Sequence, residues 1–160
     1  MAISLTGEYD CKLDPKGRLV LPAKVKAALP DTDANQLVLV RGLEPCLVLY
    51  PRSAWKVIED RVTALDEFND EYRQFQRNFM RGMMDVELDS IGRFLLPGSL
   101  RRYAGLEKDA VVVGIGNRCE IWDPARYDNF LIKDAAAFSK LAQKFLSVSP
   151  DTPGAPAAAL

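Results

Sequence analysis

Histidine is absent from the 160 residues of this chain, and its absence excludes much catalytic chemistry. Without an imidazole there can be neither a Ser-His-Asp triad nor a Cys-His pair, and no imidazole ligand for a metal. Cysteine is scarce: Cys11, Cys46 and Cys119 are odd in number and widely spaced, which indicates neither a disulfide framework nor a zinc site. We therefore expect no catalytic residue, metal or cofactor, and we expect Cys46 and Cys119 to be small core residues.

Long hydrophobic runs are also missing. The longest apolar run is far short of the roughly 20 residues that a membrane span needs, and the first five residues carry no basic leader before an apolar region. The chain is 48% hydrophobic, which is enough for a core of ordinary size without disulfides. These features predict a soluble cytoplasmic protein with no membrane partner, and no small-molecule substrate is expected.

One sequence motif occurs twice in the chain. The stretch from Asp14 to Pro22 reads Asp-Pro-Lys-Gly-Arg-Leu-Val-Leu-Pro, and it returns from Asp89 to Pro97 as Asp-Ser-Ile-Gly-Arg-Phe-Leu-Leu-Pro. Asp, Gly, Arg, Leu and Pro recur at the same places in both copies. The leading glycines, Gly7 and Gly82, also keep this register, so the chain is one unit repeated.

Each motif predicts a tight turn. Asp14 and Asp89 stand at the first position, where a carboxylate can accept backbone N–H groups. Gly17 and Gly92 can take the positive φ that lets a hairpin reverse. We expect the Asp and the Arg of each motif to meet across the turn, so that each holds the other in place.

The flanking patterns predict a small set of strands and helices. Because each half is too small to fold stably alone, we expect the halves to share one core in a single domain of residues 1–148. Repeat one would cover about residues 5–81 and repeat two about 82–148, with a disordered tail over 149–160. The strands expected are one before and one after each turn, and four more over 37–40, 46–50, 110–115 and 119–122. The helices expected are short ones over 23–29 and 99–104, one opened by 51–53, a second one after it, and an amphipathic helix over 123–148. The second helix carries an apolar stripe, expected to be core or a subunit contact, of Phe68, Tyr72, Phe75 and Phe79.

At its paired Asp-x-x-Gly-Arg motifs the chain resembles the MraZ family of bacterial transcriptional regulators. The likeness also covers the Leu-Pro after each motif, the stretch from Tyr103 to Leu106, and Glu120-Ile121-Trp122. It implies an α+β fold with a mostly β core: a tandem-repeat, swapped-hairpin (AbrB-like, SpoVT-AbrB) pseudo-dimeric β-barrel with flanking helices. It also implies a ring-shaped homo-oligomer on the nucleoid, which binds short repeated boxes in double-stranded DNA upstream of the division and cell-wall gene cluster and usually represses that cluster and its own gene.

The distribution of charge decides where DNA would bind. A net charge of −1 argues against a protein that binds nucleic acid nonspecifically through its overall charge. Residues 12–26, however, carry five basic side chains against one acidic, whereas residues 85–102 carry three of each. We expect Lys12, Lys16, Arg18 and Lys24 to face DNA, with Arg18 reading a base, the lysines on phosphate, and Arg93 as the counterpart in the second motif.

Three alternatives stay open at this stage. Asp14 and Arg18 could merely clamp their turn. The chain could be a protein-partner module, as in antitoxins built on AbrB-type domains. It could also be an enzyme that uses Asp85, Glu87 and Asp89, but alternation places these carboxylates on the solvent face of one strand, where charges are usually just solvated.

Overall fold

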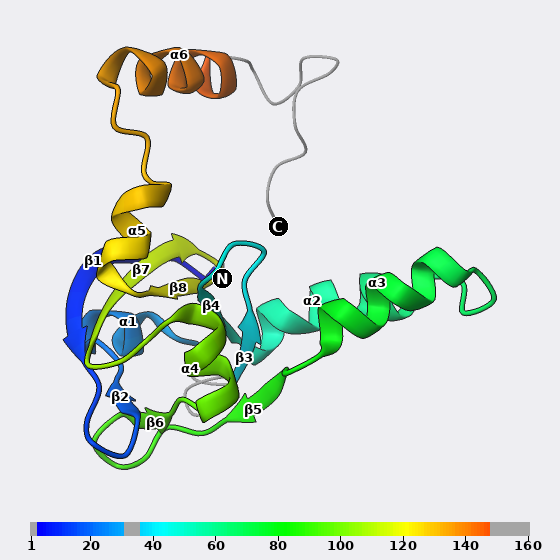
Figure 1. Ribbon diagram of the computed structural model, residues 1–160, viewed down its shortest axis with the longest axis horizontal. Coiled ribbons are helices and arrows are strands. Elements are labelled where there is room, and N and C mark those ends of the chain that lie inside the picture. Colours follow the sequence, from blue (N-terminus) through cyan, green and yellow to red (C-terminus); the bar gives the residue numbers. More distant parts are fainter. Residues whose placement is uncertain (1–2, 31–35, 148–160) are drawn as a thin grey trace. The chain divides into compact units, whose positions relative to one another are not determined.

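The computed structural model describes residues 3–30 and 36–147 of the chain (Figure 1). They fall into two compact units, one that ends at Tyr127 and one that begins at Asp128. None of the helices among these residues is long and apolar enough to cross a membrane. In chain order the elements are β1 (Leu5–Lys12), β2 (Arg18–Val20), α1 (Ala23–Ala28), β3 (Leu37–Arg41), β4 (Leu47–Pro51), α2 (Arg52–Thr63), α3 (Asp70–Met80), β5 (Met84–Val86), β6 (Arg93–Leu95), α4 (Gly98–Ala104), β7 (Asp109–Gly116), β8 (Cys119–Trp122), α5 (Pro124–Phe130) and α6 (Ala135–Leu146).

An antiparallel sheet of six strands organises the first unit, in the order β1-β7-β8-β4-β3-β5. The first half of the chain supplies β1, β3 and β4, and the second half supplies β5, β7 and β8. Along its whole length β1 pairs with β7, from Leu5 opposite Gly116 to Lys12 opposite Asp109, and β5 pairs with β3. Each half thus gives its first strand to the other half. The expected α+β fold with a mainly β core is confirmed at this level.

The two turn motifs reverse the chain as expected, but they do not close local hairpins along their length. A single bridge, Leu13 to Leu19, joins the two arms of the first motif within the described residues. Because β7 occupies the edge of β1, the return strand β2 finds another partner, and it pairs antiparallel with β6 of the second motif. The returning arms of the two motifs therefore lie side by side (Figure 1).

Several other expected elements are confirmed. The strands β3 and β4 form the hairpin predicted from the two β-rich runs, with Leu39 opposite Leu49. The short helices α1 and α4 each begin directly after a Leu-Pro, and α2 begins directly after Pro51. Proline suits these places because the residue before a helix is extended and the first helical N–H groups need no partner within the helix.

The sheet buries apolar side chains on both faces. Successive side chains of a strand point to opposite faces, and accordingly Leu37 and Leu39 join the larger core cluster while Val38 and Val40 join a second cluster around Trp55. Cys46 and Cys119 are fully buried, which confirms them as small core residues. Burial raises the pKa of both thiols to about 12.

The apolar stripe expected on the helix after residue 66 is not a core stripe. Phe68 precedes α3, which begins at Asp70 behind the capping side chain of Asn69, and Phe68 is 85% exposed. Tyr72 and Phe75 are exposed too. Phe79 is stacked on Trp55 with ring centroids 5.9 Å apart, and the exposed ring of Phe75 lies 5.4 Å from that of Phe79.

The amphipathic helix expected over residues 123–148 is interrupted. Its first part, α5, ends at Phe130, and α6 begins at Ala135 in the second unit. The carboxylate of Asp134 accepts the backbone N–H groups of Ala136 and Ala137, so this residue caps a new helix instead of continuing the old one. Residue 148 and the tail expected over 149–160 lie outside the described residues.

Candidate nucleic-acid interface

The first turn is organised by the carboxylate of Asp14. Its Oδ1 accepts the backbone N–H groups of Lys16 and Arg18, each at 2.9 Å, and its Oδ2 accepts Arg18 Nε at 2.6 Å. Gly17 has φ +83° and donates its N–H to the carbonyl oxygen of Asp14. The backbone N–H of Arg18, followed by its side chain, lowers the pKa of Asp14. The carboxylate therefore stays ionised and holds the guanidinium at neutral pH.

The second turn repeats this geometry. Asp89 Oδ1 accepts the backbone N–H groups of Ile91 at 3.1 Å and Arg93 at 2.8 Å, and Asp89 Oδ2 accepts Arg93 Nε at 2.6 Å. Gly92 also has φ +83°. The pKa of Asp89 is lowered by the same cause, the backbone N–H of Arg93 first. Asp and Arg thus meet across the turn in both copies.

The two turns meet in one ribbon, formed by β2 and β6. The register sets Arg18 opposite Leu95 and Val20 opposite Arg93. Outside the ladder, each turn glycine offers its carbonyl oxygen to the other motif: Gly17 accepts the N–H of Leu96 and Gly92 accepts the N–H of Leu21, both at 2.9 Å. The ribbon therefore has an approximate twofold symmetry, with one Asp–Arg pair at each end.

Alternation gives this ribbon two different faces. At its centre Leu19 and Phe94 point inward and are buried. The other positions point outward: the two arginines, each about one third exposed, and Val20 and Leu95, each 50% exposed. The arginines are diagonal neighbours across the pair, which places their backbones roughly 7–8 Å apart. The outward face thus carries two cations with apolar side chains between them.

Each turn also receives a cation from the other half of the chain. Arg101 of α4 lies against Gly17, because a methyl group on Gly17 would lie 2.9 Å from Arg101 Cζ, and Arg101 Nε donates to the carbonyl oxygen of Leu96 at 2.9 Å. Lys26 of α1 lies near Gly92 in the same manner, 3.7 Å from the corresponding methyl position. Lys26 therefore adds a positive charge at the second turn that the sequence of this turn alone does not indicate.

Sequence reasoning missed the placement of Arg101 and Lys26. A usable signal exists: Lys26 is four residues after Pro22, and Arg101 is four residues after Pro97. The repeat therefore puts a cation at the same place in both halves. What the repeat alone does not reveal is that each cation lies at the turn of the opposite half.

The remaining residues predicted to contact DNA, Lys12, Lys16 and Lys24, are all exposed. Lys16 lies in the first turn itself, beside Arg18. Lys12 ends β1, opposite Asp109 of β7, and Lys24 lies in α1. Lys12 directly precedes Leu13, which bridges Leu19 of β2, so it lies at the foot of the first turn.

The carboxylates weighed as catalytic groups are not gathered into a site. Asp85 is exposed on β5 and forms an ion pair with Arg52 at 2.5 Å. Asp89 is committed to its own turn. Residues 3–30 and 36–147 hold no cluster of three or more acidic or cysteine side chains that could bind a metal ion.

Comparison with known proteins finds close likenesses over nearly the whole chain. The family model described as "MraZ protein, putative antitoxin-like" matches residues 4–78 and again residues 79–148. The "Transcriptional regulator MraZ" of Cytophaga hutchinsonii is 56% identical over 142 residues, which are 89% of this chain and 94% of that protein. Proteins of the same name from Natranaerobius thermophilus (39% over 140 residues, 88% and 95%) and Clostridium beijerinckii (41% over 124 residues, 78% and 84%) are also similar.

Proposed function

Because this chain belongs to the MraZ family, whose model matches both of its halves, we propose that it is a sequence-specific DNA-binding transcriptional regulator and not an enzyme. The observation that carries the proposal is the β2–β6 ribbon, which turns Arg18 and Arg93 outward on one face. A two-stranded ribbon is narrow enough to enter the major groove of B-form DNA. The similar proteins of Cytophaga hutchinsonii and Natranaerobius thermophilus are named transcriptional regulators, which agrees with this role.

Arg18 can clamp its turn and read a base at the same time. Asp14 engages Nε alone, and the two Nη groups of Arg18 have no partner among the described residues. These Nη groups form the fork that binds O6 and N7 of guanine. The ion pair therefore orients the guanidinium in advance, which lowers the entropy lost on binding. Arg93, held by Asp89, has the same arrangement in the second motif.

The side chains on and around the ribbon suit both the bases and the phosphates of DNA. Val20, Leu95 and Ile91 are exposed next to the arginines, and apolar side chains of this kind contact the methyl group of thymine. Lys12, Lys16 and Lys24 would bind phosphate, which positions the protein without reading sequence. Such contacts make binding weaken steeply as salt rises.

A single chain offers few contacts, so the proposal includes a ring-shaped homo-oligomer. Linked copies that engage short repeated boxes raise the effective concentration of each ribbon at the next box. The boxes would lie upstream of the division and cell-wall gene cluster and of the chain's own gene, with repression as the outcome. Within each copy, repeats of about residues 5–81 and 82–148 would interlock as a swapped-hairpin, pseudo-dimeric barrel, which the β1–β7, β3–β5 and β2–β6 pairings support.

The test is binding of the purified full chain to labelled DNA from upstream of its own gene, beside a scrambled fragment of equal length and composition. Measurements across a salt series should show tighter binding to the native fragment at every salt concentration and a steep salt slope for both. Equal binding to the two fragments would contradict sequence reading, and absence of binding at physiological salt would contradict the proposal as a whole.

A second candidate function is a protein-partner module of the antitoxin type. The exposed apolar face of α6, with Phe138, Leu141 and Phe145, is the observation that favours it. A small protein that co-purifies tightly with the full chain, and that is lost on the change Phe138→Ser while DNA binding persists, would support this candidate over the first.

A further inference from the structure

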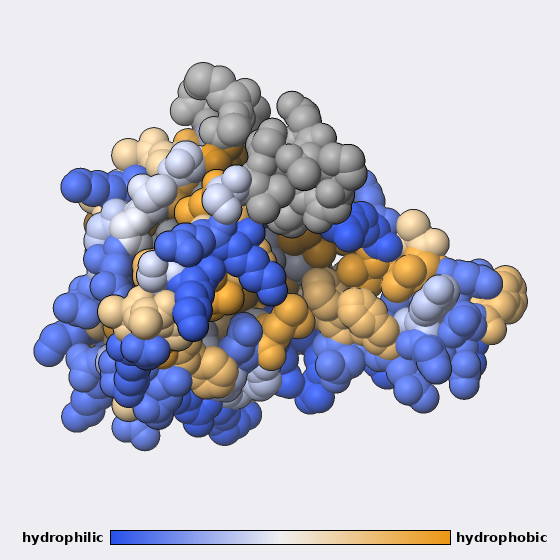
Figure 2. Space-filling view, turned by 90° about the horizontal axis from the view of Figure 1, so that it is seen from above, coloured by the Kyte–Doolittle hydropathy of each residue, from blue (hydrophilic) through white to orange (hydrophobic). Residues whose placement is uncertain are grey.

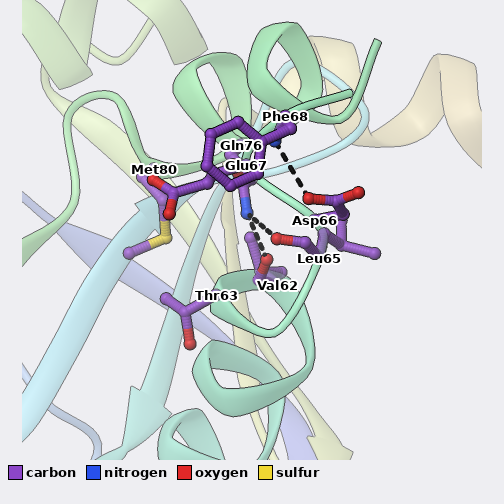
Figure 3. Close-up of a pocket in the computed structure, with 8 residues that line it drawn as sticks. All are labelled: Val62, Thr63, Leu65, Asp66, Glu67, Phe68, Gln76 and Met80. Carbon is purple, nitrogen blue, oxygen red and sulfur yellow. Dashed lines mark hydrogen bonds between the residues drawn. The ribbon is translucent and has the colours of Figure 1, made fainter. Parts of the chain in front are cut away.

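The helices α2 and α3 form an arm that projects from the sheet and ends in a tip, residues 65–71 (Figure 1). Hydrogen bonds hold this tip in one conformation. Gln76 Nε2 donates to the carbonyl oxygens of Val62 at 2.8 Å and Leu65 at 3.3 Å, as the close-up in Figure 3 shows. The backbone N–H of Phe68 donates to Asp66 Oδ1 at 3.0 Å. The exposed ring of Phe68 is therefore presented on an ordered loop.

The tip is strongly acidic around this ring. Asp66, Glu67, Asp70 and Glu71 surround Phe68, and residues 65–71 contain no basic side chain. None of the four carboxylates forms an ion pair with any residue that the structure describes. Figure 2 shows apolar side chains at the end of the projecting arm, among charged ones. An exposed aromatic ring within unpaired charges is typical of a surface that meets a partner.

The base of the same arm carries a pocket of the opposite character. It has a volume of about 390 Å³, and none of its lining residues is acidic. Arg41 stacks over the ring of Tyr103, 4.9 Å from its centroid, and Arg41 Nε is buried without a hydrogen-bond partner. A buried donor of this kind lacks a compensating acceptor. Its aromatic wall is formed by Phe75, Phe79 and Tyr103, and its two cations are Arg41 and Arg81.

We infer that the tip of one copy docks into the Arg41–Arg81 pocket of a second copy, with Phe68 on the aromatic wall and the tip carboxylates on the two arginines. Charge complementarity selects this occupant, and apolar complementarity gives Phe68 a place to be buried. The tip of a chain cannot reach the pocket of that same chain. Phe68 precedes α3 and Arg81 follows it, so the helix's 11 residues, about 16 Å, separate them.

This contact joins two different surfaces, so it is head-to-tail, and repetition of it closes a ring when the rotation between copies allows. The inference rests on the proposed homo-oligomer and names the surfaces that build it. It leaves the β2–β6 ribbon of each copy free, because neither the tip nor the pocket includes a residue of that ribbon.

The test measures the mass of the full chain by light scattering after size-exclusion chromatography, without DNA. The wild-type chain should form a multi-chain species. Phe68→Ser removes the tip's anchor and Arg81→Glu reverses a charge of the pocket, so each variant alone should run as a single chain. Both residues are exposed, so neither change should impair folding, which thermal unfolding checks.

An equal mixture of the two variants is the decisive sample. The Arg81→Glu chain keeps an intact tip and the Phe68→Ser chain keeps an intact pocket, so one productive contact forms. The mixture should therefore contain a species of two chains and none larger. A mixture that stays single-chain, or single variants that keep the wild-type mass, would overturn the inference.

Two matched changes control for loss of an aromatic ring and for charge reversal elsewhere. Phe138→Ser removes an exposed ring from α6, and Arg77→Glu reverses a charge on α3 one turn before Arg81. Both should keep the wild-type mass. Arg18→Ala should also keep it while losing preference for native DNA, which separates failure of DNA reading from failure of the contact. A wild-type chain that is itself single would overturn both the inference and the proposed ring.

Discussion

Arg101 of the second repeat lies against Gly17, the turn glycine of the first repeat. A side chain at Gly17 is therefore opposed twice: by φ +83°, and by the guanidinium that donates to the carbonyl oxygen of Leu96. Gly92 has the same φ, but its neighbour Lys26 is 3.7 Å from a methyl group placed there, an ordinary contact. The two glycines thus share the same φ and differ in how closely a cationic side chain from the other half approaches them.

We expect Gly17→Ala and Gly92→Ala each to lower the free energy of unfolding by about 1 to 2 kcal/mol, the cost of a left-handed conformation for a residue with Cβ. Gly17→Ala should cost more than Gly92→Ala, because it also displaces Arg101 from its hydrogen bond to Leu96. Urea unfolding of both variants measures the difference. In an Arg101→Ala background the difference should vanish, and a difference that persists there would show that Arg101 is not its cause.

The local chemistry of the turns could be predicted from sequence because it depends on near neighbours. Asp14 bonds to residues two and four positions ahead, and Gly17 needs its φ whatever surrounds it. The same holds for the capping of helices by the residues that precede them. These preferences are set within about five residues, so a motif is enough to predict them.

The partners of the strands could not be predicted in the same way. The alternation in β1 shows that one of its faces is buried, but it does not show that β7 of the other half lies beside it. Arg101 reaches Gly17 only because β2 pairs with β6, a long-range relationship that periodicity does not encode. The break at Asp134 was missed for another reason: the apolar spacing continues through it, and a cap that begins a new helix overrides that spacing.

The lowered pKa values of Asp14 and Asp89 predict how stability depends on pH. In the folded chain both pKa values lie below the ordinary value of 3.8. In acid the unfolded chain therefore binds more protons than the folded one, and stability rises with pH. The contribution of these two carboxylates should be complete above about pH 5 and lost as pH falls below their ordinary pKa. Urea midpoints measured between pH 7 and pH 3 check this.

The control for the pH prediction is the double change Asp14→Asn and Asp89→Asn. The amide still accepts backbone N–H groups through its oxygen but does not titrate, so the double variant should be less stable than wild type at pH 7 and should lose less stability between pH 5 and pH 3. If wild type and the double variant lose equal stability over that interval, other carboxylates dominate the acid response.

The cysteines should differ in reactivity according to burial. Burial raises the pKa of Cys46 and Cys119 to about 12, so almost no thiolate forms there at pH 8. Cys11 is half-buried, and burial raises its pKa as well, but its side chain reaches the surface. We expect an aromatic disulfide reagent at pH 8 to modify Cys11 slowly in the native chain and all three thiols after unfolding. Cys11→Ser should abolish the native reaction, and fast labelling of that variant would contradict the buried positions.

Arg18→Lys tests whether the first turn reads a base or only holds itself together. Lysine keeps the positive charge but lacks the planar fork, so it can bind phosphate and cannot pair with guanine through two hydrogen bonds. We expect the variant to lose about 1 to 3 kcal/mol of discrimination between native and scrambled DNA, with a nearly unchanged salt slope. Competition binding at two salt concentrations measures both quantities.

Lys16→Ala is the matched change in the same turn, since it removes a phosphate contact and leaves Asp14 and Arg18 in place. It should weaken binding to native and scrambled DNA equally and lower the salt slope by about one. Arg93→Lys extends the comparison to the second turn, where Lys26 supplies the neighbouring cation. If the change at Arg18 lowers thermal stability but leaves discrimination intact, the Asp14–Arg18 pair is a clamp, and base reading belongs to other residues of the ribbon.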